Sequence, residues 1–185
     1  MSAVTITWKI SDTPVTSVDH GQGENGDILT AKEIEISHGG TYQITGCKFY
    51  LAEYSGDYSG GGASPSADLA ELLAWGAQVT ASAWGGFCIN MDAVNAFPAG
   101  DWPAYDDHLD SANGEYAVFK TGQGEAIANA ILLSSAMSTA MSVDGVIPAA
   151  ASPWPKFQAR VAIPTDEDTA GVRKFDQKLR FTYTS

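Results

Sequence analysis

The C-terminal end of the chain constrains the fold most, because two segments there alternate between inward- and outward-facing side chains. The inward sets would be Phe157, Ala159, Val161 and Ile163, and then Phe175, Gln177, Leu179, Phe181 and Tyr183. A period of two is typical of strands that bury one face. Pro164 ends the first segment, and a polar connection at 165–171 follows it. We therefore expect a long antiparallel strand pair with one face in water.

Further strands are expected along the rest of the chain, separated by turn-rich stretches. They are predicted at residues 4–10, 33–37, 42–53, 84–91 and 116–119. Gly46 would mark a bulge or kink in the third of these. Residues 126–133 fit either a strand or a helix. Residues 11–25 are predicted to be loop, and 21–27 is too polar and rich in glycine to pack.

One helix is predicted, at Pro65–Trp75. Ser64 can cap it, and Pro65 suits the first helical position. Its apolar face would consist of Leu69, Leu72 and Leu73. Gly76 stands where a left-handed C-cap is needed, so we expect the helix to stop there.

These elements favour a mainly β fold: an antiparallel β-sandwich or jelly roll with one short helix inserted at about residues 65–75. The chain of 185 residues fits one domain, residues 1–185, with long loops rich in Gly, Ser and Asp. Cys47 and Cys88 each lie in an apolar stretch, so buried thiols are expected, and a disulfide between them is the alternative.

The chain is strongly acidic, with 22 Asp and Glu against 10 Lys and Arg and a formal net charge of -12. Such a chain repels phosphate backbones and anionic membrane surfaces, so no nucleic acid and no membrane is expected as a partner. Residues 1–4 carry no basic segment followed by an apolar one, and no apolar run reaches about 20 residues. We expect synthesis in a cytoplasm without a cleaved signal peptide.

No residue pattern predicts a catalytic centre, so we expect a protein that is not an enzyme and has no cofactor. His20, His38 and His108 are expected on the surface, and no G-x-S-x-G turn presents a serine to them. A hydrolase that uses some of the scattered carboxylates ranks third among the hypotheses for function.

Two acidic clusters supply the oxygen ligands that calcium prefers. They are Asp106, Asp107 and Asp110 in one loop, and Asp166, Glu167 and Asp168 in another. Neither cluster has the spacing of an EF-hand. Solvated loop charge is therefore the favoured interpretation, and calcium binding is the alternative.

Five aromatic residues in or near predicted loops are the candidate contact residues. They are Tyr54, Tyr58, Trp84, Trp102 and Tyr105. Tyr and Trp anchor protein interfaces at low entropic cost. The same rings beside Asp and Asn would suit sugar stacking, and core packing beneath a long loop is a third interpretation.

Several stretches, together about half of the chain, share a residue pattern with one group of proteins. They are 145–148 (GVIP), 157–166 (FQARVAIPTD), 171–177 (GVRKFDQ) and 179–183 (LRFTY), with 49–51, 58–60 and 68–76 (DLAELLAWG) before them. The pattern resembles that of virion structural proteins of tailed bacteriophages. The resemblance carries no catalytic residue across.

The resemblance implies a subunit of the neck, tail or baseplate, or a capsid decoration protein, located in the virion. Its partners would be other virion proteins, and it would form a homo-oligomer within the assembly. Loops at 21–27, 54–64 and 102–113 would order against neighbouring subunits, and strand edges would pair between them. The alternative is a carbohydrate- or receptor-binding β-sandwich, or a bacterial surface or secretion-machinery subunit of the same fold.

Overall fold

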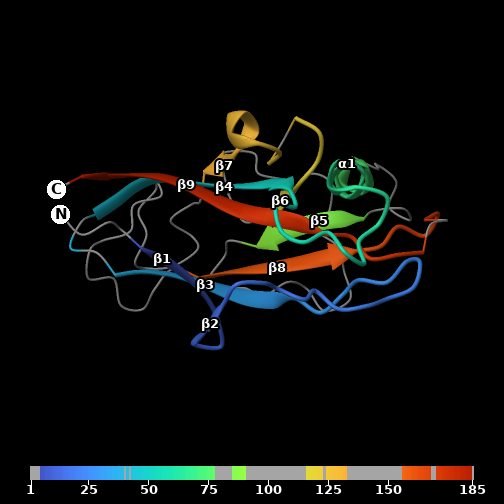
Figure 1. Ribbon diagram of the computed structural model, residues 1–185, viewed down its shortest axis with the longest axis horizontal. Coiled ribbons are helices and arrows are strands. Elements are labelled where there is room, and N and C mark those ends of the chain that lie inside the picture. Colours follow the sequence, from blue (N-terminus) through green and yellow to red (C-terminus); the bar gives the residue numbers. More distant parts are fainter. Residues whose placement is uncertain are drawn as a thin grey trace.

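The strands form two sheets that are stacked face to face (Figure 1). The structure is a computed structural model, and it describes residues 5–39, 41, 43–77, 85–90, 116–122, 124–132, 156–167 and 170–184. The larger sheet has the strand order β2 (Thr13–Val15), β1 (Ile6–Ile10), β3 (Lys32–His38), β8 (Lys156–Ala162), β5 (Gly86–Asn90) and β6 (Tyr116–Val118). The smaller sheet has the order β7 (Ile131–Leu132), β4 (Gln43–Glu53) and β9 (Phe175–Thr184).

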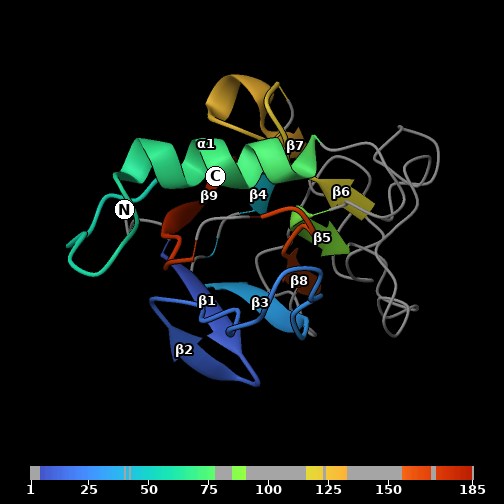
Figure 2. The same cartoon turned by 90° about the vertical axis from the view of Figure 1, so that its right-hand side faces the viewer.

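All strand pairs within these two sheets are antiparallel. The helix α1 (Pro65–Gly76) is inserted between β4 and β5 in the chain and lies against β5, β4 and β9 (Figure 2). The predicted fold class, a mainly β antiparallel sandwich with one short inserted helix, is confirmed for the described part of the chain.

Phe49 of β4 lies at the centre of the core between the sheets. Its ring packs edge-on against Phe157 of β8 and Phe119, with centroids 5.3 and 5.5 Å away, and stacks on Phe87 of β5 at 6.1 Å. All four rings are buried. Burying one such side chain stabilises a fold by roughly 1.5–3 kcal/mol, so this cluster fixes how the two sheets face each other.

The two C-terminal strands do not pair with each other, so that prediction is wrong. β8 pairs with β3 and β5 in the larger sheet, whereas β9 pairs with β4 in the smaller one. Alternation specifies the buried face of a strand but not its neighbour. β8 also lacks the expected wet face, because Arg160 and Ala162, opposite the Phe157 side, are 3% and 1% exposed.

The start of α1 is confirmed, and the helix ends one residue after the predicted Trp75, but the predicted left-handed C-cap at Gly76 is wrong. The Ser64 hydroxyl accepts the N–H of Ala67 at 3.1 Å, as an N-cap does. Gly76 is helical, and the C-cap is Ala77 in a right-handed conformation. A Cβ on Gly76 would lie 2.0 Å from the carbonyl oxygen of Phe119. Close packing of the helix, rather than a positive φ, therefore requires the glycine.

The loop predicted at 11–25 contains β2, which forms a hairpin with β1. The segment 21–27 is exposed along its whole length, and it is tied to the end of β8 by a backbone hydrogen bond: the N–H of Gly26 donates to the carbonyl of Ile163 at 2.9 Å. The ambiguous segment 126–133 divides into a short 3-10 helix (Ile127–Asn129) and β7. Gly46, with φ of 59°, lies at the register shift of β4, as predicted.

Cys47 and Cys88 are both buried thiols, and no disulfide joins them. Burial raises the pKa of the Cys47 thiol to about 12. Among the described residues, no helix has the length and apolar composition needed to cross a membrane.

Candidate functional site

A cleft of about 740 Å³ lies beside the start of β9. Most of its lining comes from residues 15–23 and 171–177, and α1 and single residues of other segments complete it. Small-molecule sites in proteins have volumes of roughly 300–1,000 Å³, so the cleft is large enough for one ligand. The side chains that give it its character are Trp8, His20, Tyr54, Trp75, Arg173 and Gln177.

His20 is held in the wall of the cleft by two phenylalanine rings. Its imidazole stacks on Phe175 of β9 at 6.1 Å and meets Phe87 of β5 edge-on at 5.6 Å. Burial in this apolar setting lowers the pKa of His20 to about 4; the charge of Lys32 adds to the effect and that of Asp19 opposes it. The imidazole is therefore neutral at physiological pH.

His20 and Gln177 both line the cleft, and each has one buried polar atom without a partner in the described part of the chain. The two Nε2 atoms lie 3.2 Å apart. His20 Nδ1 and Gln177 Oε1 are buried and have no hydrogen-bond partner among the described residues. Buried polar atoms are nearly always paired, and a neutral imidazole offers one donor and one acceptor.

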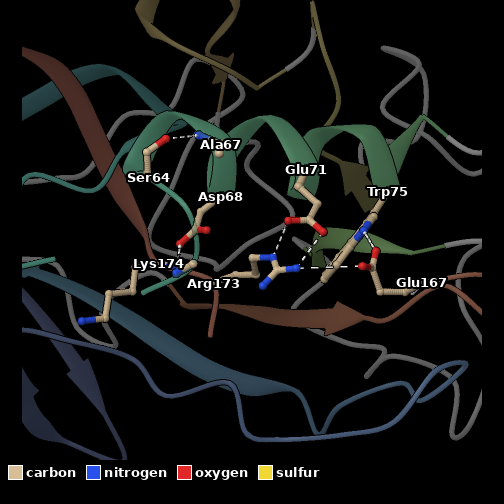
Figure 3. A network of polar contacts seen from close by, with 9 residues as sticks. Ser64, Ala67, Asp68, Glu71, Trp75, Glu167, Arg173 and Lys174 are labelled. Carbon is tan, nitrogen blue, oxygen red and sulfur yellow. Dashed lines mark hydrogen bonds and ion pairs between the residues drawn. The ribbon is translucent and has the colours of Figure 1, made fainter. Parts of the chain in front are cut away.

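Arg173 ties the start of β9 to α1 and to the connection after β8 (Figure 3). Its Nε and Nη2 contact the two oxygens of Glu71 at 2.5 and 2.7 Å. Glu167 lies 3.9 Å from Nη2 and accepts the indole N–H of Trp75 at 2.6 Å. The hydrogen bond to Glu71 raises the pKa of Arg173 further above its ordinary value. We name these four residues the arginine clamp.

Asp68, in the first turn of α1, holds Lys174, the residue that follows Arg173 and immediately precedes β9. Its carboxylate, which is 1% exposed, accepts the backbone N–H of Lys174 at 2.8 Å (Figure 3). The ammonium of Lys174 donates to the carbonyl of Ser59 and lies 5.5 Å from the ring centre of Tyr54. The loop before α1 is thus fastened to the same segment that forms one wall of the cleft.

Of the two predicted contact aromatics that the structure describes, Tyr54 lines the cleft. Tyr58 lies outside its lining and packs beside Gly61, where a Cβ would come within 2.5 Å of the ring. Trp84, Trp102 and Tyr105 lie outside the described residues.

The acidic clusters give no calcium site in the described part of the chain. No group of three metal-ligating side chains comes together among those residues. Glu167 belongs instead to the arginine clamp. Asp166 is exposed, and Asp106, Asp107, Asp110 and Asp168 lie outside the described residues.

Sequence reasoning missed His20, Trp75 and Arg173 as residues of the cleft. The prediction that His20 and His38 lie on the surface is wrong, because His20 is packed between two rings and His38 is 4% exposed. His108 lies outside the described residues. In the sequence, Arg173 was noted only as part of the 171–177 pattern, and that pattern does not show that Arg173 forms an ion pair with Glu71 of α1.

The edge of β9 is a second candidate surface. β9 pairs with β4 on one side, and no strand in the described part of the chain pairs with its other side (Figure 1). Asp176, Lys178 and Arg180 face away from the core, because the residues between them pair with the buried Phe49 and Leu51. An open edge offers backbone N–H and C=O groups to another chain.

No protein-family model matches the chain, and no curated protein matches it. The function is therefore inferred from the cleft and from the edge of β9.

Proposed function

We propose that this protein is a non-enzymatic structural subunit of a tailed-phage particle, in the neck, tail or baseplate or as a capsid decoration protein. It acts through strand-edge and loop contacts with neighbouring virion proteins. The observation that carries the proposal is the ten-residue strand β9 of a two-sheet scaffold, whose outer edge pairs with no strand in the described part of the chain. The residue pattern of the C-terminal segments, which resembles that of virion proteins, supports the same role.

A structural subunit needs an edge that keeps its shape before its neighbour arrives. The residues that lead into β9 are held at two successive positions, Arg173 by Glu71 and Lys174 by the buried Asp68. β9 itself pairs with β4 from Phe175 to Thr184. The edge is thus presented by a rigid element, which lowers the entropic cost of adding a strand to it.

The test is the composition of purified particles. Virions produced from the genome that encodes this chain are banded on a density gradient, and their proteins are quantified by mass spectrometry. We expect the chain in a fixed stoichiometric ratio to the major structural proteins, and immunogold label at one position on the particle. Its absence from particles, with the chain present in the soluble lysate, would refute the virion role.

A carbohydrate- or receptor-binding module is the second candidate, and the cleft is the observation that favours it. The cleft combines aromatic walls with the buried polar atoms of His20 and Gln177 that have no partner among the described residues. Tyr54→Ala should abolish binding on a glycan array, whereas Tyr58→Ala, a matched tyrosine outside the lining, should leave it unchanged. A folded wild-type protein that binds no glycan would remove this candidate.

A further inference from the structure

Natural sheet edges are protected from strand addition by charged side chains, proline, bulges or inward-pointing charges. Of these features, β9 has the outward-facing charges of Asp176, Lys178 and Arg180 and lacks the other three. β9 contains no proline, and its only inward-facing polar side chain between Phe175 and Phe181 is the neutral Gln177. The register shift of the sheet lies in β4, so β9 itself runs without an extra residue. The strand is therefore able to accept a partner over most of its length.

We propose that β9 pairs with β9 of a second copy of the chain, antiparallel and across a two-fold axis. The two three-stranded sheets would then join into one continuous sheet. This inference rests on the proposed function, since it names the first partner of an assembly subunit. A two-fold contact of this kind uses the same residues on both copies.

The charges along β9 select the register of the pair. A two-fold axis perpendicular to the sheet brings outward side chains opposite outward ones. With the axis at Lys178, Asp176 of each copy faces Arg180 of the other, which gives two opposite-charge pairs. The single like-charge contact, between the two Lys178 side chains, involves long stems that can diverge. An axis at Leu179 would instead set Lys178 against Arg180 twice, which is unfavourable.

The same register also suits the core-facing side of the strand. Phe175 of one copy would face Phe181 of the other, and Gln177 would face Leu179. Phe175, Leu179 and Phe181 are only partly buried in the single chain, and all three pack against the edge of its core. Cross-strand aromatic pairs stabilise a sheet, so the contact would extend the core across the axis.

Lys178 and Arg180 are accessible for such a contact, whereas the Asp176 side chain is 18% exposed. The Lys178 side chain is 40% exposed and lies 3.4 Å from Asp176 of its own chain. Asp176 also accepts the hydroxyl of Ser55 at 2.6 Å, which fixes the carboxylate beside the edge. Arg180 is exposed and contacts no acidic side chain in the described part of the chain.

Sedimentation equilibrium of the full chain tests the contact, over a range of about 1–200 μM, which covers dissociation constants typical of weak and moderate dimers. We expect the wild type to dimerise. Arg180→Asp places two carboxylates opposite each other at both pairs and should weaken the dimer at least about tenfold. The double variant Asp176→Arg with Arg180→Asp exchanges the charges and should restore the affinity. Lys156→Glu, an equal charge change on the larger sheet, should leave it unchanged.

Three results would overturn the β9 contact: a wild type that stays monomeric throughout, a charge exchange that fails to restore the dimer, and equal weakening by Lys156→Glu. Hydrogen exchange of the dimer gives a second readout, because protection should increase at the β9 amides. A monomeric chain that is nevertheless found in purified particles would overturn this contact alone. A charge-dependent dimer that is absent from particles would overturn the virion role alone.

Discussion

Protonation of His20 should destabilise the protein under mildly acidic conditions. Its pKa is lowered from 6.5 to about 4 in the folded chain, because the imidazole is packed between Phe87 and Phe175. A depressed pKa means that the unfolded chain takes up the proton first as the pH falls. The contribution of the neutral His20 to stability is therefore fully present above about pH 6.5 and is lost between there and pH 4.

The size of this loss follows from the two pKa values. For a single group with these values, the free energy of unfolding falls by about 2 kcal/mol between pH 7.5 and pH 5, and by about 3 kcal/mol at pH 4. The comparison at pH 5 is the cleaner one, because ordinary carboxyl groups, with pKa values of about 4, are still mostly ionised there.

Urea unfolding at pH 7.5 and pH 5 measures the effect in the wild type and in His20→Phe. Phenylalanine keeps an aromatic ring between Phe87 and Phe175 but cannot be protonated. We expect the variant to lose about 2 kcal/mol less than the wild type over this interval. His38→Gln, which leaves His20 in place, should retain the full loss. The same pH dependence in His20→Phe and wild type would refute the reasoning.

Three further predictions follow from the packing. Gly76→Ala should destabilise by more than about 2 kcal/mol in urea unfolding, because its Cβ would meet the Phe119 carbonyl at 2.0 Å; a neutral effect would contradict the close packing. Arg173→Lys should cost about 1–3 kcal/mol in the same assay, because lysine cannot contact both Glu71 oxygens; no loss would show that the arginine clamp does not stabilise the fold. A thiol reagent at pH 8 should modify neither Cys47 nor Cys88 before unfolding and both after it, and rapid labelling of the native chain would contradict their burial.

Local features of the fold could be read from the sequence because a few neighbouring residues determine them. Ser64 and Pro65 set the start of α1, and Gly46 marks the bulge of β4. The alternation in β8 and β9 gave most of their core-facing residues correctly, but Tyr183, which was predicted to face inward, is 55% exposed. It could not give their partners, because an alternating strand presents the same face to any neighbour, and β9 joins a strand more than a hundred residues earlier in the chain.

The cleft could not be predicted because each of its walls has an ordinary sequence. Residues 15–23 have the composition of a free loop, yet His20 lies in the apolar space between β5 and β9.

The reason for the glycine at position 76 could not be predicted either. Its position at the end of the helix suits a left-handed C-cap as well as it suits close packing. Only the tertiary contact with Phe119 shows that the missing side chain, and not the backbone conformation, is what matters there.

The placement of basic residues distinguishes the two sheets. In the larger sheet, Lys9 lies across from Glu35, and their side chains are 3.4 Å apart. In the smaller sheet, Lys48 lies directly opposite Arg180, although the chain has only 10 basic residues against 22 acidic ones. A like-charge pair in this position costs roughly 0.2–1 kcal/mol. In the proposed dimer, Asp176 of the second copy would lie on the other side of Arg180. Its negative charge would offset the repulsion between Lys48 and Arg180, which is uncompensated in the single chain.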